Sequence, residues 1–317
     1  CISPETLFIF NPFCWGYCIK NVYKQNWLAN AKMPMMSKNP SVDELDGVAR
    51  EIRKSIVRMI TKAKASHIGG SLSAADILAA LYFRILSIDP KDPEDGGRDI
   101  FILSKGHCCS ALYAALAERG FFQKGKLDEF CANGGSLWGH VSRGCAPGVE
   151  ATTGSLGHGL PIGLGMAIAA KRSNQKRKIM VMLSDGECDE GSVWEAALCA
   201  AHFRLDNLTI IIDYNKIQSF GSVKEVMNLD PLAGKWKSFG WEAREIDGHD
   251  MGQVVGVLEK LPLAAGKPSV IVANTIKGKG ISFMENKLEW HYKSPTPEQC
   301  EAAIRELDNA KGKGGSA

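Results

Sequence analysis

Short runs of almost wholly apolar residues constrain the fold of this chain more than any other feature of its sequence. Residues 179–183 read IMVML, residues 208–213 read LTIIID, and similar runs stand at 100–103 and 269–274. A strand with one wet face alternates apolar and polar side chains, so continuous apolar runs indicate strands that are buried on both faces. Because helix-like segments separate these runs, we predict an α/β fold with a parallel sheet that helices cover on both faces.

The segments between the strands carry helix signals. Ser41 and Glu44 form a capping-box pattern, and apolar residues then recur at helical spacing as far as Ile60. A glycine-bearing loop at 66–71 is expected to end this helix. We expect further helices at 73–86, 109–119, 159–171, 192–204 and 251–261, a strand at 241–247, and a long glycine-rich loop at 132–158.

Charge and cysteine content limit which partners and which cellular compartment we expect. The 38 basic and 35 acidic residues leave a net charge of +3, which gives no reason to expect nucleic acid or an anionic membrane as a partner. The longest apolar run is too short to span a bilayer. The ten cysteines include no CxxC pair, so we expect reduced thiols in a cytoplasmic protein and treat a disulfide framework as the weaker alternative.

The regular pattern occupies residues 37–300, where we expect one large domain. Residues 1–36 have no basic stretch before their apolar part and no clear cleavage site, so a secretory signal is not expected. We interpret them as an N-terminal extension before a native start near Met33, with a docking segment as the alternative. Residues 301–317 are expected to be the end of a helix and a flexible polar tail.

Polar side chains follow two of the predicted strands. Parallel sheets bind ligands at the carboxyl ends of their strands. Asp185 and Gly186 come directly after one strand, and Asn215 follows the next. A carboxylate and an amide oxygen suit Mg²⁺ or Ca²⁺ carrying a diphosphate, and the amides of a helix beginning after Gly186 would favour a phosphate. A helix cap by Asp185 and a turn at Asn215 explain the same residues equally well.

Wider segments carry a family resemblance. Asp185 and Gly186, followed after 28 residues by Asn215, resemble the thiamine diphosphate motif Gly-Asp-Gly…Asn, with Ser184 in place of its first glycine. In addition, LSKGHCCSALYA (103–114), PGVEATTGSLGHGLPIGLGMA (147–167), SDGECDEGSVWEAA (184–197) and TIKGKGISFMENKLEWH (275–291) resemble, in order, the N-terminal section of transketolase. The similarity covers about residues 41–295.

The resemblance implies that residues 37–300 are a thiamine diphosphate-binding domain. It implies that Asp185, Asn215 and the backbone carbonyl of Ile217 bind Mg²⁺, with Ca²⁺ or Mn²⁺ as possible substitutes. Other residues would hold the cofactor. By the same resemblance, Gly186 contacts the diphosphate, His107 and His291 lie near it, and the cofactor is cradled by Gly154, Ser155 and Leu156, although proline is common in the family at the position of Ser155.

The resemblance also implies a set of catalytic groups. His67, His140 and His291 would contact the hydroxyls of a sugar and assist proton transfers. Glu190 and Glu195 would belong to a carboxylate relay across a subunit interface; a solvated helix face is the alternative for Glu195. The remaining histidines are expected to have no catalytic role, with His202 packed in its helix and His249 in a turn; they are His158, His202 and His249.

A transketolase is about twice as long as this chain, and its pyrimidine-binding domain follows the section matched here. Only residues 296–317 follow that section in this sequence. The resemblance therefore implies a subunit that works with a separate C-terminal, pyrimidine-domain transketolase subunit in a heterotetramer. Together they would move a two-carbon ketol unit from a ketose phosphate to an aldose phosphate.

Two alternatives remain open. The alpha subunit of a thiamine-dependent 2-oxoacid dehydrogenase is split at the same boundary, but the histidine set and residues 275–291 argue against it. A non-catalytic homologue that only binds or regulates is the other alternative. Intact Asp185, Asn215 and His291 speak against that interpretation.

Overall fold

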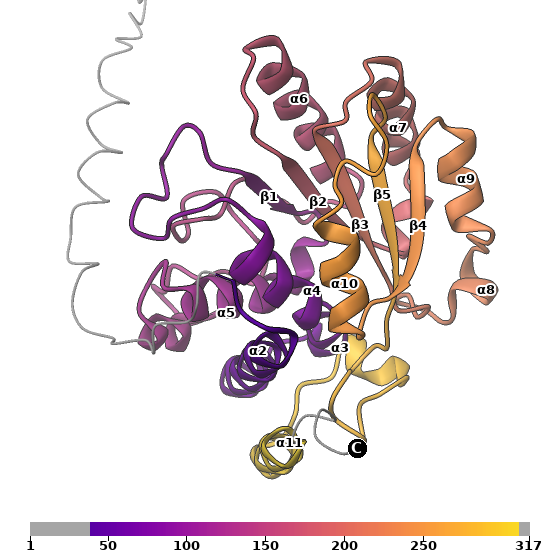
Figure 1. Cartoon of the computed structure of the whole chain (residues 1–317). Coiled ribbons are helices and arrows are strands. Elements are labelled where there is room, and N and C mark those ends of the chain that lie inside the picture. Colours follow the sequence, from indigo (N-terminus) through magenta and orange to yellow (C-terminus); the bar gives the residue numbers. More distant parts are fainter. Residues whose placement is uncertain (1–38, 311–317) are drawn as a thin grey trace, which may run out of the picture. The chain divides into compact units, whose positions relative to one another are not determined.

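The computed structural model describes residues 39–310, and its centre is a five-stranded parallel sheet. The strand order is β1-β2-β3-β5-β4, as Figure 1 shows. The strands are β1 (Ile100–Leu103), β2 (Ile179–Ser184), β3 (Leu208–Tyr214), β4 (Glu242–Asp247) and β5 (Ser269–Asn274). The predicted α/β class with a parallel sheet is confirmed.

Burial explains why the apolar runs became strands. Every residue of β1, β2 and β3 is buried, because helices cover both faces of the sheet. β4 lies at one edge, where Arg244, Glu245 and Asp247 are exposed, as expected for a strand that must not pair with another chain.

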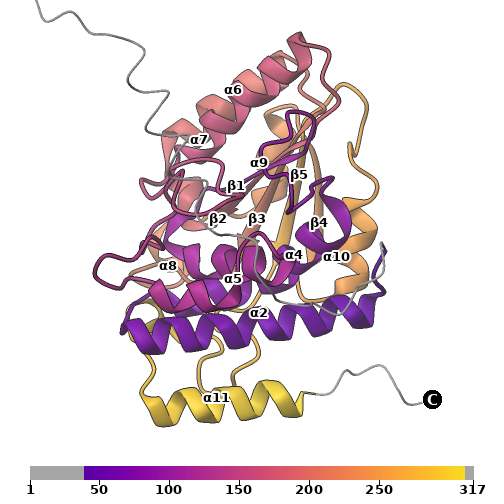
Figure 2. The ribbon, with the colours of Figure 1, turned by 90° about the vertical axis from the view of Figure 1, so that its left-hand side faces the viewer.

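Helices form a layer on each face of the sheet (Figures 1 and 2). One layer holds α2 (Val42–Ala63), α4 (Ala75–Ala80), α5 (Cys109–Arg119) and α10 (Met251–Leu258), which pack on one another. The other layer holds α6 (Gly159–Arg172), α7 (Gly191–His202) and α9 (Leu232–Ser238). A last helix, α11 (Pro297–Asn309), packs against α2 and crosses the predicted boundary at residue 300.

The prediction of a loop at 66–71 and one helix at 73–86 was wrong in detail. The structure has α3 (Ile68–Ser73), α4 and a π-helical turn, Leu81–Ile85. Gly69 and Gly70 lie inside α3 rather than in a loop. A Cβ on Gly69 would stand 2.9 Å from Lys277 Cγ, and one on Gly70 3.0 Å from Cys108 Sγ. These glycines therefore permit close packing instead of turning the chain.

One prediction is confirmed and a smaller one needs correction. The helix predicted at 192–204 is α7 (Gly191–His202), and a 3₁₀ turn (Gly186–Asp189) lies between Gly186 and this helix. His202, expected to be packed, is exposed at the end of α7, with its ring against that of Phe203. The expectations for residues 1–36 and 311–317 lie outside the described residues.

Two expectations about chemistry and environment can be compared with residues 39–310. The seven cysteines in this range are all free. None of the helices described there combines the length and the apolar content needed to cross a bilayer.

Candidate active site

The carboxyl ends of the central strands open onto a cavity of about 460 Å³. Its lining includes every site residue that the sequence predicted except Ser155 and Glu195, which are both exposed. The lining residues that were predicted are His67, His107, His140, Gly154, Leu156, Asp185, Gly186, Glu190, Asn215, Ile217 and His291. A second hollow of about 470 Å³ lies at the ends of β4 and β5 and contains none of them. We therefore take the first cavity as the candidate site, on the chemistry of its lining rather than its size.

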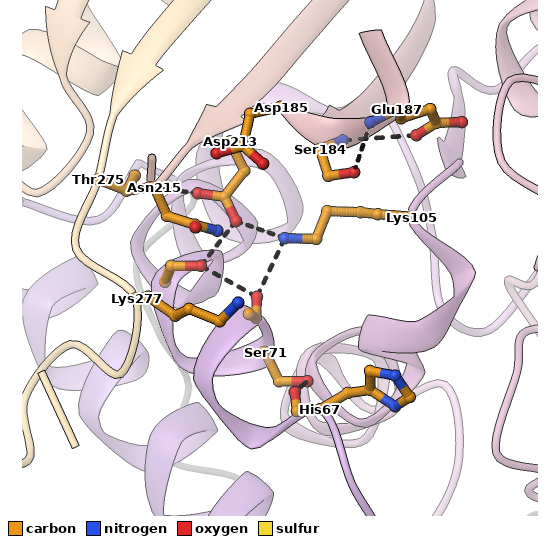
Figure 3. A network of polar contacts seen from close by, with 12 residues as sticks. His67, Ser71, Lys105, Ser184, Asp185, Glu187, Asp213, Asn215, Thr275 and Lys277 are labelled. Atoms are coloured by element: carbon orange, nitrogen blue, oxygen red, sulfur yellow. Dashed lines mark hydrogen bonds and ion pairs between the residues drawn. The ribbon is translucent and has the colours of Figure 1, made fainter. Parts of the chain in front are cut away.

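Asp185 and Asn215 lie at the ends of neighbouring strands (Figure 3). Asp185 Oδ1 accepts a hydrogen bond from the backbone N–H of Gly186 at 2.8 Å, and Oδ2 accepts one from that of Lys216 at 2.7 Å. Asn215 Oδ1 accepts from the N–H of Ile217 at 3.2 Å. The cap and turn contacts offered as alternatives are thus present. They leave lone pairs on these oxygens, so they do not exclude cation binding.

The environment of Asp185 fits a cation. Its side chain is almost fully buried, and burial together with the neighbouring Asp213 raises the pKa of the carboxyl to about 6. No lysine or arginine forms an ion pair with it among the described residues. An oxygen-rich site with one uncompensated carboxylate matches the ligand preference of Mg²⁺. Within residues 39–310 there is no cluster of three or more His, Cys, Asp or Glu residues that suits a metal, so a cation here would rely on amide and carbonyl oxygens.

Lys105 and Asp213 form a buried ion pair beside this site, which the sequence reasoning missed. Lys105 follows β1 and also donates to the carbonyl of Gly70 at 3.1 Å. Asp213, in β3, accepts further bonds from Ser73 Oγ at 2.6 Å and from the hydroxyl of Thr275. Although burial opposes ionisation, Lys105 holds the pKa of Asp213 below its usual value. The available signal was a charged residue at the end of each of two apolar strands.

Glu187 is a second missed residue, and it positions the loop expected to cradle the cofactor. It is fully buried and accepts hydrogen bonds from the hydroxyl of Ser104 and from the N–H of Gly157 at 2.8 Å. Ser192 Oγ donates to the carbonyl of Gly157 at 2.8 Å. Gly157 has a φ of +79°, and a Cβ there would stand 2.4 Å from Ser192 Oγ, so only glycine fits. These contacts fix the segment that includes Gly154 and Leu156.

Four histidines from distant segments gather in the cavity. The ring centroid of His67 lies 5.2 Å from that of His107, 5.1 Å from that of His291 and 6.2 Å from that of His140. Burial lowers the pKa of His67 to about 4 and that of His291 to about 3, with help from neighbouring cationic groups. Burial also places the pKa of His107 well below its ordinary value. These three rings are therefore neutral at pH 7 and can donate or accept hydrogen bonds.

Lys277 completes the cluster and was also missed. Its Nζ donates to the carbonyl of Ile217 at 2.8 Å and lies 2.7 Å from His291 Nδ1. Burial lowers the pKa of Lys277 to about 8. The site therefore holds a buried ammonium group next to the carbonyl predicted to bind a metal.

The remaining predicted residues lie at the rim or outside the site. Glu190 and Glu195 are exposed, and neither carboxylate bonds another side chain within residues 39–310. His158 is exposed and its Nδ1 lies 3.0 Å from the carbonyl of Leu156. His249 makes a buried contact with Asp76 outside this cavity.

The fold is a parallel sheet, and a carboxylate and a carboxamide lie at the carboxyl ends of two of its central strands, beside a set of neutral histidines. Together these features define a cofactor-binding α/β domain. The family model described as "Transketolase, thiamine diphosphate binding domain" matches residues 46–307. The chain therefore belongs to the transketolase family and comprises its thiamine diphosphate-binding domain.

Named relatives agree, and three of them are named as transketolase subunits. The chain is 48% identical over 270 residues to an apulose-4-phosphate transketolase subunit of Actinobacillus succinogenes, covering 85% of this chain and 98% of that protein. It is 45% identical over 265 residues to a 6-deoxy-6-sulfo-D-fructose transketolase subunit of a Clostridium species, covering 84% of this chain and 96% of that protein.

Relatives named simply as transketolase match over part of their length. The structure of transketolase from Campylobacter jejuni superposes with a TM-score of 0.77 at 29% identity, covering 84% of this chain and 42% of that chain. Human transketolase is 34% identical over 264 residues, which cover 83% of this chain and 42% of the human protein. The chain thus spans less than half the length of these two relatives.

Proposed function

We propose that this chain is the cofactor-binding subunit of a two-subunit, Mg²⁺-dependent transketolase. With a separate pyrimidine-domain subunit, in a heterotetramer, it transfers a two-carbon ketol unit from a ketose phosphate to an aldose phosphate. The observation that carries this proposal is the conjunction of the Asp185–Asn215 pair with the histidine cluster in one cavity. Relatives that are named as transketolase subunits, matched over nearly their whole length, support the division into two polypeptides.

In this proposal the metal is held by the carboxylate of Asp185, the side-chain oxygen of Asn215 and the carbonyl of Ile217. The carbonyl of Ile217 already accepts one bond from Lys277 and has a second lone pair for a cation. The Lys277 ammonium group and the neutral ring of His107 lie in the same cavity and would face the diphosphate. The fully buried Glu187 holds the N–H of Gly157 and so fixes the loop that carries Gly154 and Leu156.

Bound thiamine diphosphate would supply the electron sink for cleavage of a carbon–carbon bond. The histidines of this chain would serve the sugar. His67, His140 and His291 would bond its hydroxyl groups and accept or return protons at their oxygens. Burial keeps His67 and His291 neutral, so each ring has one N–H and one acceptor nitrogen. His67 Nδ1 lies 2.8 Å from Ser66 Oγ, which leaves its Nε2 for the sugar. His291 Nδ1 accepts from Lys277, so its Nε2, 3.3 Å from Ser219 Oγ, would be the donor to a sugar oxygen.

The rim of the cavity supports a partner subunit. Phe220 is 84% exposed and Tyr292 58% exposed, and both line the cavity together with Val226. Large apolar groups gathered at one rim are typical of a surface that another protein covers. A partner seated there would also exclude water from the proton-transfer groups.

The substrate is proposed as a class. The relatives' names specify apulose-4-phosphate and 6-deoxy-6-sulfo-D-fructose as sugars of transketolases of this kind. We therefore propose a ketose of related size as donor, with its anionic end recognised by the partner subunit.

The test is reconstitution. The full chain, purified alone and with a pyrimidine-domain transketolase subunit, is assayed with a ketose phosphate and an aldose phosphate, and separately with a 2-oxoacid. We expect thiamine diphosphate binding by calorimetry in the presence of Mg²⁺, and ketol transfer only when both subunits are present. Full activity of the chain alone, or turnover of the 2-oxoacid instead of the sugar, contradicts the proposal.

A further inference from the structure

A buried series of polar contacts connects the outer helices to the loop that carries Lys277. Arg53 of α2 binds Asp76 of α4 through two contacts, Nη1 to Oδ1 at 2.9 Å and Nη2 to Oδ2 at 2.5 Å. His249 Nδ1 lies 2.6 Å from Asp76 Oδ2, and His249 Nε2 accepts a hydrogen bond from the backbone N–H of Ile276 at 2.8 Å. All three side chains are less than a tenth exposed. Within this series, His249 is the side chain that reaches the loop.

Both ring nitrogens of His249 have assigned roles. The N–H of Ile276 can only donate, so Nε2 carries no proton and the ring proton lies on Nδ1. Asp76 is the matching acceptor: although burial opposes its ionisation, Arg53 and His249 hold the pKa of its carboxyl below the usual value. The protein therefore fixes both the tautomer and the orientation of this ring.

The turn that carries His249 is built to lie against the end of β5. The N–H of Gly248 donates to the carbonyl of Asn274 at 2.8 Å. A Cβ on Gly248 would stand 2.5 Å from Thr275 Cγ2, so only glycine permits this approach. Asp250, directly after His249, caps α10 by accepting from the N–H of Gln253 at 3.0 Å. The ring is therefore held next to residues 274–276.

Three backbone N–H groups tie the loop around Lys277 to other segments, and the carbonyl of Lys277 accepts a further bond from the N–H of Asn286 at 2.9 Å. The N–H of Thr275 donates to the carbonyl of Tyr214 at 3.1 Å, and that of Gly278 to the carbonyl of Gly69 at 2.9 Å. The N–H of Ile276 donates to His249, the one contact of the three in which a side chain is the acceptor. The Lys277 side chain leaves the loop between these contacts and enters the cavity of the site.

We propose that His249 is a positioning residue: by holding the amide of Ile276 it keeps the Lys277 ammonium group against Ile217 and His291. The inference rests on the proposed function, since it assigns this placement the role of a cation beside a bound diphosphate. His249 itself does not line that cavity.

Two substitutions separate the contacts. His249→Asn keeps a donor near Asp76 but is too short to accept from Ile276. His249→Gln places a carboxamide oxygen near the position of Nε2 and can accept from Ile276. Two measurements on the full chain follow: hydrogen exchange of the amides of residues 276–278 without ligand, and the dissociation constant for thiamine diphosphate with Mg²⁺.

For His249→Asn we expect these amides to exchange about tenfold faster and thiamine diphosphate to bind about fivefold more weakly, as for the loss of one buried hydrogen bond. We expect His249→Gln to restore most of both values. Val270→Ala is the matched control, because Val270 is fully buried at the other end of β5. It should lower the unfolding midpoint and leave the affinity unchanged.

Wild-type exchange and affinity in His249→Asn would overturn the proposal. So would equal losses of affinity in His249→Asn, His249→Gln and Val270→Ala, which would make His249 an ordinary part of the core. If the unaltered chain itself does not bind thiamine diphosphate with Mg²⁺, the proposed function fails, whereas the exchange rates still decide whether His249 holds the loop.

Discussion

Two aspartates at neighbouring strand ends share one chemistry and have opposite environments. Asp213 binds the ammonium group of Lys105 and two hydroxyls, and these hold its pKa below the usual value in spite of its burial. Asp185 accepts bonds from two backbone amides and no cation, and burial raises its pKa to about 6. The two strands pair directly at this point, with Ser184 opposite Asp213.

The fold itself supplies Asp213 with a cation, whereas it leaves the carboxylate of Asp185 without one. A buried carboxylate with its own cation and hydrogen bonds contributes to a defined structure. A buried carboxylate without a cation costs free energy, which a ligand can recover on binding. The comparison therefore favours a structural role for Asp213 and a binding role for Asp185.

The largest expected effect comes from breaking the satisfied pair. Lys105→Met leaves Asp213 buried and unpaired, so we expect the free energy of unfolding to fall by about 3–5 kcal/mol. Urea denaturation of the ligand-free chain measures it. The double variant Lys105→Met, Asp213→Asn removes the stranded charge and should recover at least half of the loss. Equal stability of the single variant and the unaltered chain would contradict a structural role.

The next largest effect is expected at Asp185, the buried carboxylate that has no cation of its own. Asp185→Asn keeps the shape of the side chain but removes its charge, so we expect the affinity for thiamine diphosphate with Mg²⁺ to fall by at least about a hundredfold, as for loss of a metal ligand. Calorimetry measures it. Asp189→Asn, an exposed carboxylate at the same cavity, is the matched control and should change the affinity less than about twofold. Unchanged affinity in Asp185→Asn would remove the residue from the site.

A smaller effect should appear in the pH dependence of the metal-free chain. The unfolded carboxyl of Asp185 ionises near its ordinary value of 3.8, and the folded one at about 6. Between these values the folded state binds more protons, so the contribution of Asp185 to stability falls as pH rises from about 4 to 6, by roughly 1–3 kcal/mol. Denaturation in EDTA measures it. Asp185→Asn should flatten this part of the profile, and an unchanged slope would show that Asp185 ionises normally.

The smallest effect on stability is expected for Glu195, which lies away from both Asp185 and Asp213. Glu195 is exposed on α7 and bonds no other described side chain, so Glu195→Gln should change the stability of the isolated chain by less than about 0.5 kcal/mol. A relay across a subunit interface would appear only in the assembled enzyme, as reduced ketol transfer at unchanged stability. No loss of transfer in the assembly would leave Glu195 as part of a solvated helix face.

The fold was predictable where local sequence determines it. The run at 179–183 is wholly apolar and that at 208–213 is so except for Thr209 and Asp213, so the strands and the parallel sheet follow from the local pattern alone. Gly69 and Gly70 misled the prediction because their role depends on Lys277 and Cys108, which are distant in sequence. His202 was misplaced because helical spacing alone did not show that the last turn of α7 faces solvent.

The site was predictable where a motif or resemblance singled out a residue, as for Asp185 and Asn215. Lys105, Asp213 and Glu187 were missed because their contacts join residues from different strands and loops, and no local spacing marks such a pair. Lys277 stands in a segment that carried the resemblance, yet only the fold brings it to Ile217. Features of the site that depend on a partner subunit, such as the proposed relay through Glu190 and Glu195, cannot be predicted without the surface of that partner.

The strand order has a consequence for folding during synthesis on the ribosome. β5 lies between β3 and β4, although it is made after both. Until residue 274 emerges, one edge of β3 stays open and β4 has no neighbour with which to pair. A nascent chain therefore exposes unpaired edges of β3 and β4 late in synthesis, and these edges could pair with another chain. The segment that closes them continues directly into Lys277 and then to His291, so the candidate site is completed only after the sheet has closed.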